Sequence, residues 1–425
     1  MEARARLVVV GNGMAGARLV EDLLAAAPGR FAITVIGAEA GGSYNRILLS
    51  AVLAGDRERH DIVTHDAAWY AARGVLLRSA ETATAIDRTE GLVRTDRDAA
   101  VPYDLLVLAT GSTPVMLPIP GADLAGVVAF RDLADVERMI AAAAAGTRAI
   151  VICGGLLGLE AADGLRRRGM AVTVVHLMPW IMERQLDRRA ADMLKASLIR
   201  RGIRFVMPAE TAAILGRGRA TGIRLGDGRT LPADLVVMGV GIRANTALAL
   251  AAGLDCRKGV VVDDRLQTSD PRIYALGECI EHQGRVYGLV GPIWEQSRIL
   301  AKHLAGVRDA AYRGSIATAS LKIAGIDTYS LGDLDATDGA EEILLDDAAR
   351  GVYRKLVLSA GRLQGAVLYG DISDAGWYAE LVRQNRPIEA WRHDLIFGRQ
   401  LAERGGRGGG DERPAAALPM AAAVP

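Results

Sequence analysis

Two glycine-rich turns in this sequence have the spacing of turns that bind the phosphates of a dinucleotide. The first follows an apolar strand in "LVVVGNGMAGARLVEDL", where three glycines fit G-x-G-x-x-G. In such a turn the first glycine allows a tight bend, the second lets backbone N–H groups approach a pyrophosphate, and the third lets the next helix pack on the strand. We predict a dinucleotide site built from Gly11, Asn12, Gly13, Met14, Ala15 and Gly16.

A carboxylate after the next predicted strand supports this site. The strand is "AITVIGAE", and Glu39 closes it. A carboxylate at this point can accept hydrogen bonds from an adenosine ribose. The alternative is a turn that packs a helix on a strand and holds no ligand.

The same outline returns in "AIVICGGLLGLEAADG", with a cysteine at the first glycine position. Gly155 and Gly158 keep the second and third positions, and Glu160 follows. Cysteine resists a tight turn if φ is positive. We expect φ to be extended here, so that Cys153 fits at modest cost. We predict a second dinucleotide site that also includes Leu157, with a packing turn as the alternative.

The strand after the second turn, "AVTVVH", ends at His176. Many dinucleotide sites carry an acid here for the ribose 2′-hydroxyl of NADH, or a basic residue for the 2′-phosphate of NADPH. Neither an acid nor a basic residue stands at this strand end, so the sequence only weakly indicates whether NADH or NADPH is used. We take NADH as slightly favoured and place His176 beside the nucleotide.

The elements around the two turns repeat one architectural unit. Each turn joins a strand to a helix, and "ADLVVMGVGIRAN" echoes "YDLLVLATGSTP" as a later strand entering a glycine turn. Strands connected through helices predict parallel sheets. A helix is predicted at Glu295–Leu304. Beyond about Gly306, "EEILLDD" and "VYRKLVLSAGRLQGAVLYGD" predict a three-stranded meander with a hairpin loop at Ser359–Gly361, then a helix.

Composition excludes several function classes. Lys plus Arg number 51 against 50 for Asp plus Glu, so no basic surface for nucleic acid is encoded. The three cysteines form no metal or iron–sulfur spacing, and we expect no metal. Apolar runs are too short to span a membrane, and the first strand leaves no room for a signal peptide. We expect a cytoplasmic protein.

Several motifs, in order over about the first 300 residues, resemble those of flavoprotein reductases with two dinucleotide-binding domains. They are "VVVGNGMAG", Glu39, "YNRILLS", "LATGSTP", "GLLGLE", "GVGIRAN" and "TSDPRIYALGEC". A narrower likeness, to the flavoprotein portion of assimilatory NAD(P)H nitrite reductase large subunits and to nitrate reductase electron-transfer subunits, lies in "NRILLSAVLAG", "HLMPWIMERQLD" and "LKIAGIDTYSLGD".

The resemblance implies an α/β fold of the glutathione reductase type, with two Rossmann-like domains and a small α+β C-terminal domain. The expected parts are an FAD domain of 1–118 and 245–306, an NAD(P) domain of 119–244, a C-terminal domain of 307–402 and a disordered tail of 403–425.

The same resemblance implies roles for individual residues. FAD would lie on the first turn, with Arg46 near its phosphates and Glu278 near its ribityl or pyrophosphate region. A helix that starts near Trp294 would point its N-terminus at the flavin. NADH or NADPH would lie along the second turn. The further residues expected around the cofactors are Ala83, Thr110, Gly111, Gly241 and Gly277.

Departures from the family pattern narrow the chemistry. A CxxxxC pair for dithiol chemistry is missing, and so is a cysteine in residues 40–50. Rubredoxin and ferredoxin reductases commonly have a lysine at Ala51. We therefore expect an FAD-dependent NAD(P)H oxidoreductase that passes electrons to a partner redox protein of nitrate or nitrite assimilation. The alternatives are a rubredoxin or ferredoxin reductase and a non-catalytic NADH-sensing flavoprotein.

Overall fold

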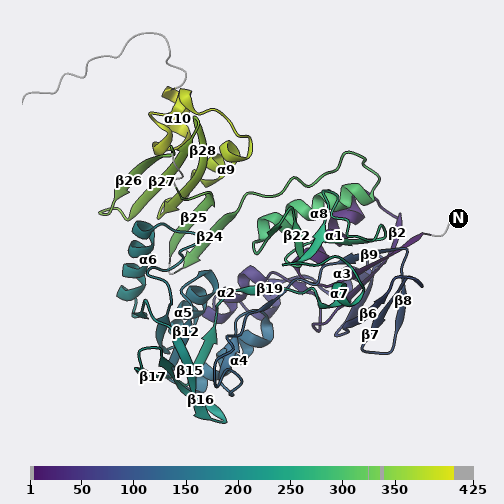
Figure 1. Ribbon diagram of the computed structural model, residues 1–425, viewed down its shortest axis with the longest axis horizontal. Coiled ribbons are helices and arrows are strands. Elements are labelled where there is room, and N and C mark those ends of the chain that lie inside the picture. The colour runs from purple at the N-terminus through teal and green to yellow at the C-terminus, as the bar shows by residue number, and fades with distance from the viewer. Residues whose placement is uncertain (1–3, 324, 336–338, 406–425) are drawn as a thin grey trace, which may run out of the picture. The chain divides into compact units, whose positions relative to one another are not determined.

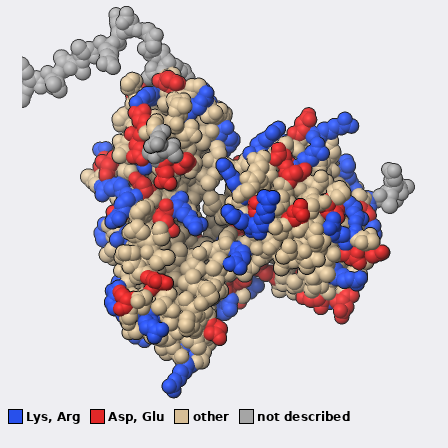
Figure 2. Space-filling view, viewed as in Figure 1, with Lys and Arg blue, Asp and Glu red and all other residues tan. Residues whose placement is uncertain are grey.

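A computed structural model describes residues 4–323, 325–335 and 339–405, and it divides into two compact units, one up to Ile326 and one from Asp327. The first unit holds both glycine turns (Figure 1). No helix in the described ranges is long and apolar enough to cross a membrane. On the face shown in Figure 2, acidic and basic side chains are interspersed.

Two parallel five-stranded sheets form the frame of the first unit. Their orders are β21-β9-β1-β2-β5 and β11-β18-β12-β13-β14. The first sheet comprises β1 (Ala5–Val10), β2 (Phe31–Gly37), β5 (Leu76–Ser79), β9 (Leu105–Leu108) and β21 (Ile273–Ala275). The second comprises β11 (Val127–Ala129), β12 (Arg148–Ile152), β13 (Ala171–Val175), β14 (Arg204–Val206) and β18 (Leu235–Met238).

The two sheets repeat one another in register as well as in order. Val10 pairs with Ile36 and with Leu108, and Ile152 pairs with Val175 and with Met238 in the same way. The carboxyl ends of β1 and β12 thus lie beside the carboxyl ends of both neighbouring strands. At this edge of each sheet, the turn that follows the central strand can bind a ligand. The repeat and the parallel pairing confirm the predicted fold class.

Helices cover both sheets, and antiparallel strands are inserted in each repeat. The helices of the first unit are α1 (Met14–Ala26), α2 (Leu49–Ala54), α3 (Ala67–Ala71), α4 (Leu133–Ala145), α5 (Leu156–Arg167), α6 (Arg188–Arg200), α7 (Ala247–Ala251) and α8 (Val290–Leu304). The inserted three-stranded sheets are β6 (Ala83–Asp87), β7 (Leu92–Thr95) and β8 (Ala100–Pro102), and β15 (Thr211–Arg217), β16 (Arg219–Leu225) and β17 (Thr230–Pro232).

Shorter strands complete the first unit. Antiparallel β10 (Ser112–Pro114) and β19 (Ile242–Ala244) pair with each other where the chain passes between the two repeats. The remaining strands are β3 (Ser43–Tyr44), β4 (Val63–His65), β20 (Val260–Val262), β22 (Ile280–His282) and β23 (Arg285–Val286).

Apolar contacts fix the helices that carry the turns. Helix α1 packs beside α8, and α5 packs against α2 (Figure 1). At the second contact Gly164 lies so close to Leu53 that an added Cβ would be 2.7 Å from Leu53 Cγ. Leu53 itself is fully buried, which contributes about 2 kcal/mol of hydrophobic stabilisation.

The unit from Asp327 is an antiparallel sheet with helices. The sheet has the order β24-β25-β28-β27-β26. Its strands are β24 (Thr318–Ile323), β25 (Ile326–Gly332), β26 (Glu341–Asp347), β27 (Val352–Ser359) and β28 (Arg362–Tyr369), and the helices are α9 (Ala375–Arg383) and α10 (Arg399–Gly405). The predicted meander, hairpin and helix are confirmed; the hairpin bends at Ala360 and Gly361, with φ of 49° and 68°. Strand β25, which pairs with β28, was not expected.

Two boundaries differ from the sequence expectations. Helix α10 continues to Gly405, so residues 403–405 of the predicted tail are helical, and 406–425 lie outside the described residues. Helix α8 begins at Val290, before both Glu295 and Trp294. Its Pro292 stands in the first turn, where a proline costs no intrahelical hydrogen bond. The predicted division into four parts stays a prediction.

Candidate functional site

The first turn follows β1, and its three glycines differ in what requires them. Gly11 has φ +115°, and an added Cβ would lie 2.1 Å from the carbonyl oxygen of Ala109. A Cβ on Gly16 would lie 1.9 Å from the carbonyl oxygen of Gly11. These two glycines are needed by the turn itself. Gly13 has φ −77°, and its nearest neighbour would be Arg46 Nε at 3.9 Å, so the space beside it is open.

The open space beside Gly13 fits a pyrophosphate. Gly13 is the N-cap of α1, and no side chain of the described residues caps this helix end. The first N–H groups of α1 therefore face a space that an anion can enter, with the positive end of the helix dipole behind them. Asn12 accepts a hydrogen bond from Tyr70 Oη at 2.5 Å, and Gly37 lies against Asn12, where an added Cβ would be 2.7 Å from Asn12 Cβ. Met14 and Ala15 form the first turn of α1.

Glu39 and Arg46 are brought together next to this turn. Arg46 Nη2 forms an ion pair with Glu39 Oε1, and Tyr44 Oη donates to Glu39 Oε2 at 2.6 Å. Arg46 also donates to the carbonyl oxygen of Arg131 at 3.0 Å. Burial raises the pKa of Tyr44, so its hydroxyl remains a donor. The residues predicted for ribose and phosphate are thus held side by side.

Glu278 lies in a second polar cluster, after β21. It accepts a hydrogen bond from Ser112 Oγ at 2.7 Å and forms an ion pair with Arg131. Arg131 therefore connects Glu278 to the Arg46 cluster. Sequence reasoning missed Arg131, which belongs to no motif, and it gave no role to Tyr44, although this residue opens the motif "YNRILLS".

The remaining residues predicted to bind FAD lie in segments next to the first turn. Gly277 faces α1, where an added Cβ would be 2.9 Å from Ala15 Cβ, and its N–H donates to Gln296 Oε1 at 2.8 Å. Thr110 and Gly111 follow β9 and are bonded to Asn245, which donates to the Thr110 carbonyl at 2.8 Å and to the Gly111 carbonyl at 2.9 Å.

Three predicted residues have packing or backbone roles in the structure. Ala83 opens β6 and packs against the core of the first sheet. Gly241 has φ +115°, and its carbonyl accepts from the N–H of Val115 at 2.9 Å. The indole of Trp294 lies under the guanidinium of Arg18, 5.7 Å from the ring centroid, beside α1. Their contacts with a cofactor stay predictions.

The second turn repeats the first with one strained residue. Cys153 has φ +98°, so the expectation of an extended conformation is wrong. Its carbonyl oxygen packs on Gly158, where an added Cβ would lie 2.0 Å away. Gly155 has φ −82° and is the N-cap of α5, again without a side-chain cap among the described residues. An added Cβ there would meet Cys153 Sγ at 3.6 Å, so the cradle is open despite the cysteine.

The strain at Cys153 gives a testable order of stability. We expect Cys153→Gly to be more stable than Cys153→Ala by about 1 kcal/mol, because alanine keeps the Cβ in a left-handed conformation and glycine does not. Urea unfolding of both variants measures the difference. We also expect Cys153→Gly to bind NAD(P)H at least as tightly as the wild type. A glycine variant that is less stable than the alanine variant, or that loses nucleotide affinity, would give Cys153 a role beyond the turn.

His176 faces the second turn and is 3% exposed. The N–H of Gly154 donates to His176 Nδ1 at 3.1 Å, while Nε2 lies 3.0 Å from the Trp180 carbonyl oxygen and 3.1 Å from Glu183 Oε2. Gly154 has no room for a side chain here, since an added Cβ would be 3.2 Å from His176 Cγ and 2.9 Å from Ile181 Cγ2. Sequence reasoning gave no role to Glu183, although it lies within the motif "HLMPWIMERQLD".

Glu160 lies in α5, one turn into the helix, and Leu157 is exposed before it. Burial raises the pKa of Glu160 to about 7. Among the described residues, no hydrogen bond or ion pair reaches its carboxylate. Helix α2, which packs against α5, carries Ala51, so that position supplies no cationic partner.

The raised pKa of Glu160 sets a pH dependence of stability. The unfolded chain loses this proton near the ordinary value of 4.5, while the folded chain keeps it to about 7. Stability is therefore lost between these pH values as pH rises. Glu160→Gln should raise the free energy of unfolding by about 3 kcal/mol at pH 8 and leave it nearly unchanged near pH 4.5. Denaturant unfolding across pH measures this.

The matched control for Glu160 is the exposed Glu137, which forms an ion pair with Arg59 on the surface. Glu137→Gln should change stability by less than about 1 kcal/mol at any pH in this range. A constant offset for Glu160→Gln from pH 4.5 to 8 would show that the carboxylate is ionised throughout in the folded protein.

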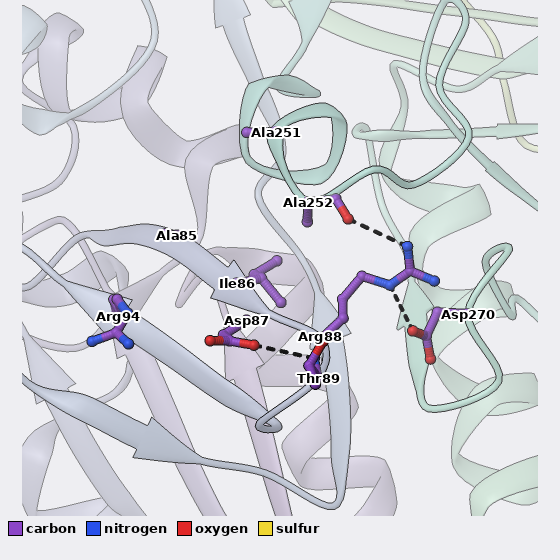
Figure 3. Close-up of a pocket in the computed structure, with 9 residues that line it drawn as sticks. All are labelled: Ala85, Ile86, Asp87, Arg88, Thr89, Arg94, Ala251, Ala252 and Asp270. Atoms are coloured by element: carbon purple, nitrogen blue, oxygen red, sulfur yellow. Dashed lines mark hydrogen bonds and ion pairs between the residues drawn. The ribbon is translucent and has the colours of Figure 1, made fainter.

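A further pocket lies between β6, the end of α7 and Asp270, away from the two glycine turns. Figure 3 shows Arg88 reaching from the end of β6 toward the segment after α7. Its Nε donates to Asp270 Oδ2 at 2.7 Å, and its Nη1 lies 3.4 Å from the Ala252 carbonyl oxygen. Arg88 and Asp270 in this pocket are thus paired with each other. The described residues contain no cluster of His, Cys, Asp and Glu that could hold a metal ion.

Two nucleotide cradles on repeated parallel sheets define a class of protein, and the comparison with family models gives the same class. Residues 5–299 match the pyridine nucleotide-disulphide oxidoreductases, and residues 318–386 match the rubredoxin NAD+ reductase C-terminal domain. The chain belongs to the pyridine nucleotide-disulphide oxidoreductase family, which implies FAD and NAD(P)H as cofactors. Its three cysteines are free.

The individual relatives are more specific. Nitrite reductase [NAD(P)H] of Bacillus subtilis is 46% identical over 383 residues, which are 90% of this chain and 48% of that protein. The assimilatory nitrate reductase electron transfer subunit of Bacillus subtilis is 42% identical over 391 residues, or 92% and 51%. A ferredoxin reductase structure from Rhodopseudomonas palustris has a TM-score of 0.84 at 28% identity, covering 91% of this chain and 96% of that chain.

These relatives confirm the resemblance drawn from the motifs. The chain is an NAD(P)H-dependent flavoprotein reductase related to the electron-transfer components of nitrite and nitrate reductases. It spans about half the length of the two curated relatives.

Proposed function

We propose that this chain takes electrons from NADH, passes them through FAD and delivers them to a partner redox protein of nitrate or nitrite assimilation, in the cytoplasm. FAD is held by residues 1–118 and 245–306, and the nucleotide by 119–244. The observation that carries the proposal is the pair of cradles, each open beside its second glycine, Gly13 or Gly155. The two Bacillus subtilis relatives, a nitrite reductase and a nitrate reductase electron transfer subunit, support a partner that acts on nitrate or nitrite.

The chain supplies positioning and charge in this proposal. When bound, FAD accepts a hydride from NAD(P)H and releases the electrons to the next carrier. The N–H groups at the start of α1 and of α5 bind the two pyrophosphates, and Arg46 adds positive charge beside the first. No side chain has to act as an acid or base in hydride transfer, so the residues of the site act by orientation.

An anaerobic titration tests the proposal. Purified protein is titrated with NADH and, separately, NADPH, while the flavin absorbance near about 450 nm is followed. Full bleaching by one equivalent is expected. A yellow protein that neither nucleotide bleaches would contradict the proposal and favour the non-catalytic sensing flavoprotein.

A second candidate function is the reduction of rubredoxin or a ferredoxin. The match of residues 318–386 to the rubredoxin NAD+ reductase C-terminal domain and the likeness to a ferredoxin reductase favour it. Ala51 stands against it. Mixing the reduced protein with a rubredoxin, a ferredoxin and a nitrate reductase catalytic subunit in stopped-flow experiments separates the two. Transfer that is fastest to the nitrate reductase subunit supports the first proposal.

A further inference from the structure

The segment after β13 folds back onto the second glycine turn. Met182, with φ +52°, donates its N–H to the Gly154 carbonyl at 2.9 Å, and Leu186 donates to the Met182 carbonyl at 2.8 Å. The Trp180 indole closes the loop by donating to the Leu186 carbonyl at 3.2 Å. Glu183 follows Met182 directly, so this loop holds it beside the turn.

His176 fixes the carboxylate of Glu183 in that position. A backbone N–H can only donate, so the hydrogen bond from Gly154 makes His176 Nδ1 an acceptor and leaves the proton on Nε2. That Nε2–H points to Glu183 Oε2 at 3.1 Å and to the Trp180 carbonyl oxygen at 3.0 Å. The imidazole therefore links the backbone of the turn to an acceptor carboxylate.

The other carboxylate oxygen of Glu183 is available to a ligand. Oε1 has no hydrogen-bond partner in the part of the chain that the structure describes, and the Glu183 side chain is 25% exposed. Burial raises the pKa of the Cys153 thiol, and the negative charge of Glu183 adds to that rise. The carboxylate is thus close enough to act on the first residue of the turn.

We propose that Glu183 is the acid that binds the 2′-hydroxyl of the NADH adenosine ribose, in place of an acid at the end of β13. In dinucleotide units this hydroxyl lies beside the turn, at the end of the second strand, where His176 stands here. His176 acts as the positioning residue. The same carboxylate repels the 2′-phosphate of NADPH, so the chain selects NADH. This inference rests on the proposed function.

The exposed neighbour Arg184 provides the opposing charge and a matched control. Its positive charge acts on the Cys153 thiol in the opposite sense to that of Glu183, so both side chains lie near the turn. A guanidinium here attracts a 2′-phosphate, whereas a carboxylate excludes it. Removing each charge separately shows which one governs selection.

The test measures the dissociation constants of NAD+ and NADP+ on the oxidised, FAD-loaded protein by calorimetry, together with flavin bleaching by NADH and NADPH. We expect the wild type to prefer NADH, and Glu183→Gln to lower that preference at least about tenfold, mainly by weaker NAD+ binding and stronger NADP+ binding. Glutamine can still accept the hydrogen bond from His176, so the fold is retained. Arg184→Gln should keep or increase the preference for NADH.

The outcomes separate this inference from the proposed function. Bleaching of the wild type by neither nucleotide would overturn the proposed function. Three other results would overturn the role of Glu183 and leave the proposed function standing. The Glu183→Gln variant could bleach with an unchanged nucleotide preference, it could lose affinity for both nucleotides equally, or the wild type could prefer NADPH. An equal loss is the result expected if Glu183 only supported the loop.

Discussion

Replacement of Gly13 by valine yields a folded, colourless protein. Gly13 has extended backbone angles, φ −77° and ψ −171°, which valine adopts readily. Among the described residues, the nearest atom to an added Cβ is Arg46 Nε at 3.9 Å, so the apoprotein has room for the side chain. The pyrophosphate and the valine compete for the same space. We expect FAD affinity to fall more than about 100-fold, or about 3 kcal/mol, as measured by the flavin-to-protein absorbance ratio.

Two glycines serve as controls for Gly13. Gly376 lies in the first turn of α9, and no neighbour among the residues that the structure describes is within 4 Å of an added Cβ, so Gly376→Val should keep its FAD. Gly16→Val should instead damage the fold, because its Cβ would meet the Gly11 carbonyl oxygen at 1.9 Å. A yellow Gly13→Val protein with one flavin per chain would refute the assignment of FAD to the first turn.

Replacement of Gly155 by valine yields a yellow protein that NAD(P)H no longer bleaches. Gly155 is the counterpart of Gly13, with φ −82°. In the described part of the chain, the atom nearest to an added Cβ is Cys153 Sγ, at the ordinary distance of 3.6 Å. The first turn is unaffected, so FAD stays. We expect the bleaching rate at limiting NADH to fall at least about 100-fold, since the nucleotide pyrophosphate loses its place.

The control for Gly155→Val is chemical reduction. Dithionite, which needs no nucleotide site, should bleach the variant as fully as the wild type. If NADH bleaches Gly155→Val as fast as it bleaches the wild type, the nucleotide binds elsewhere. Together the Gly13 and Gly155 variants separate the two turns, one by colour and one by reduction.

The sequence predicted the repeated unit because its signals are local. A strand, a glycine turn and a helix are contiguous, so β1 with α1 and β12 with α5 appear where the motifs place them. The meander of the second unit was likewise visible in its alternating residues and its hairpin. Strand β25 was missed because it joins β28, far along the chain, and no turn marks the pairing.

The parts of the site that lie in sequence motifs were predicted. The contacts between segments that are distant in the sequence were not. Glu39 and Arg46 were singled out separately, but their ion pair and the connection through Arg131 depend on segments that meet only in the fold. Glu183 comes seven residues after His176, on an irregular loop without periodicity. The extended φ expected at Cys153 is wrong because the close packing of its carbonyl oxygen on Gly158 imposes a positive φ, and the residue type does not reveal this packing.

The two turns resolve one steric conflict in opposite ways. At the first, the turn contributes the side chain of Asn12 and the strand end is Gly37; at the second, the turn has Gly154 and the strand end contributes His176. In each pair there is room for one side chain. An exchange of residues between the two halves must therefore change both members of a pair at once, because either single step creates a collision or a void. If the halves share an ancestor, they diverged here through compensating changes.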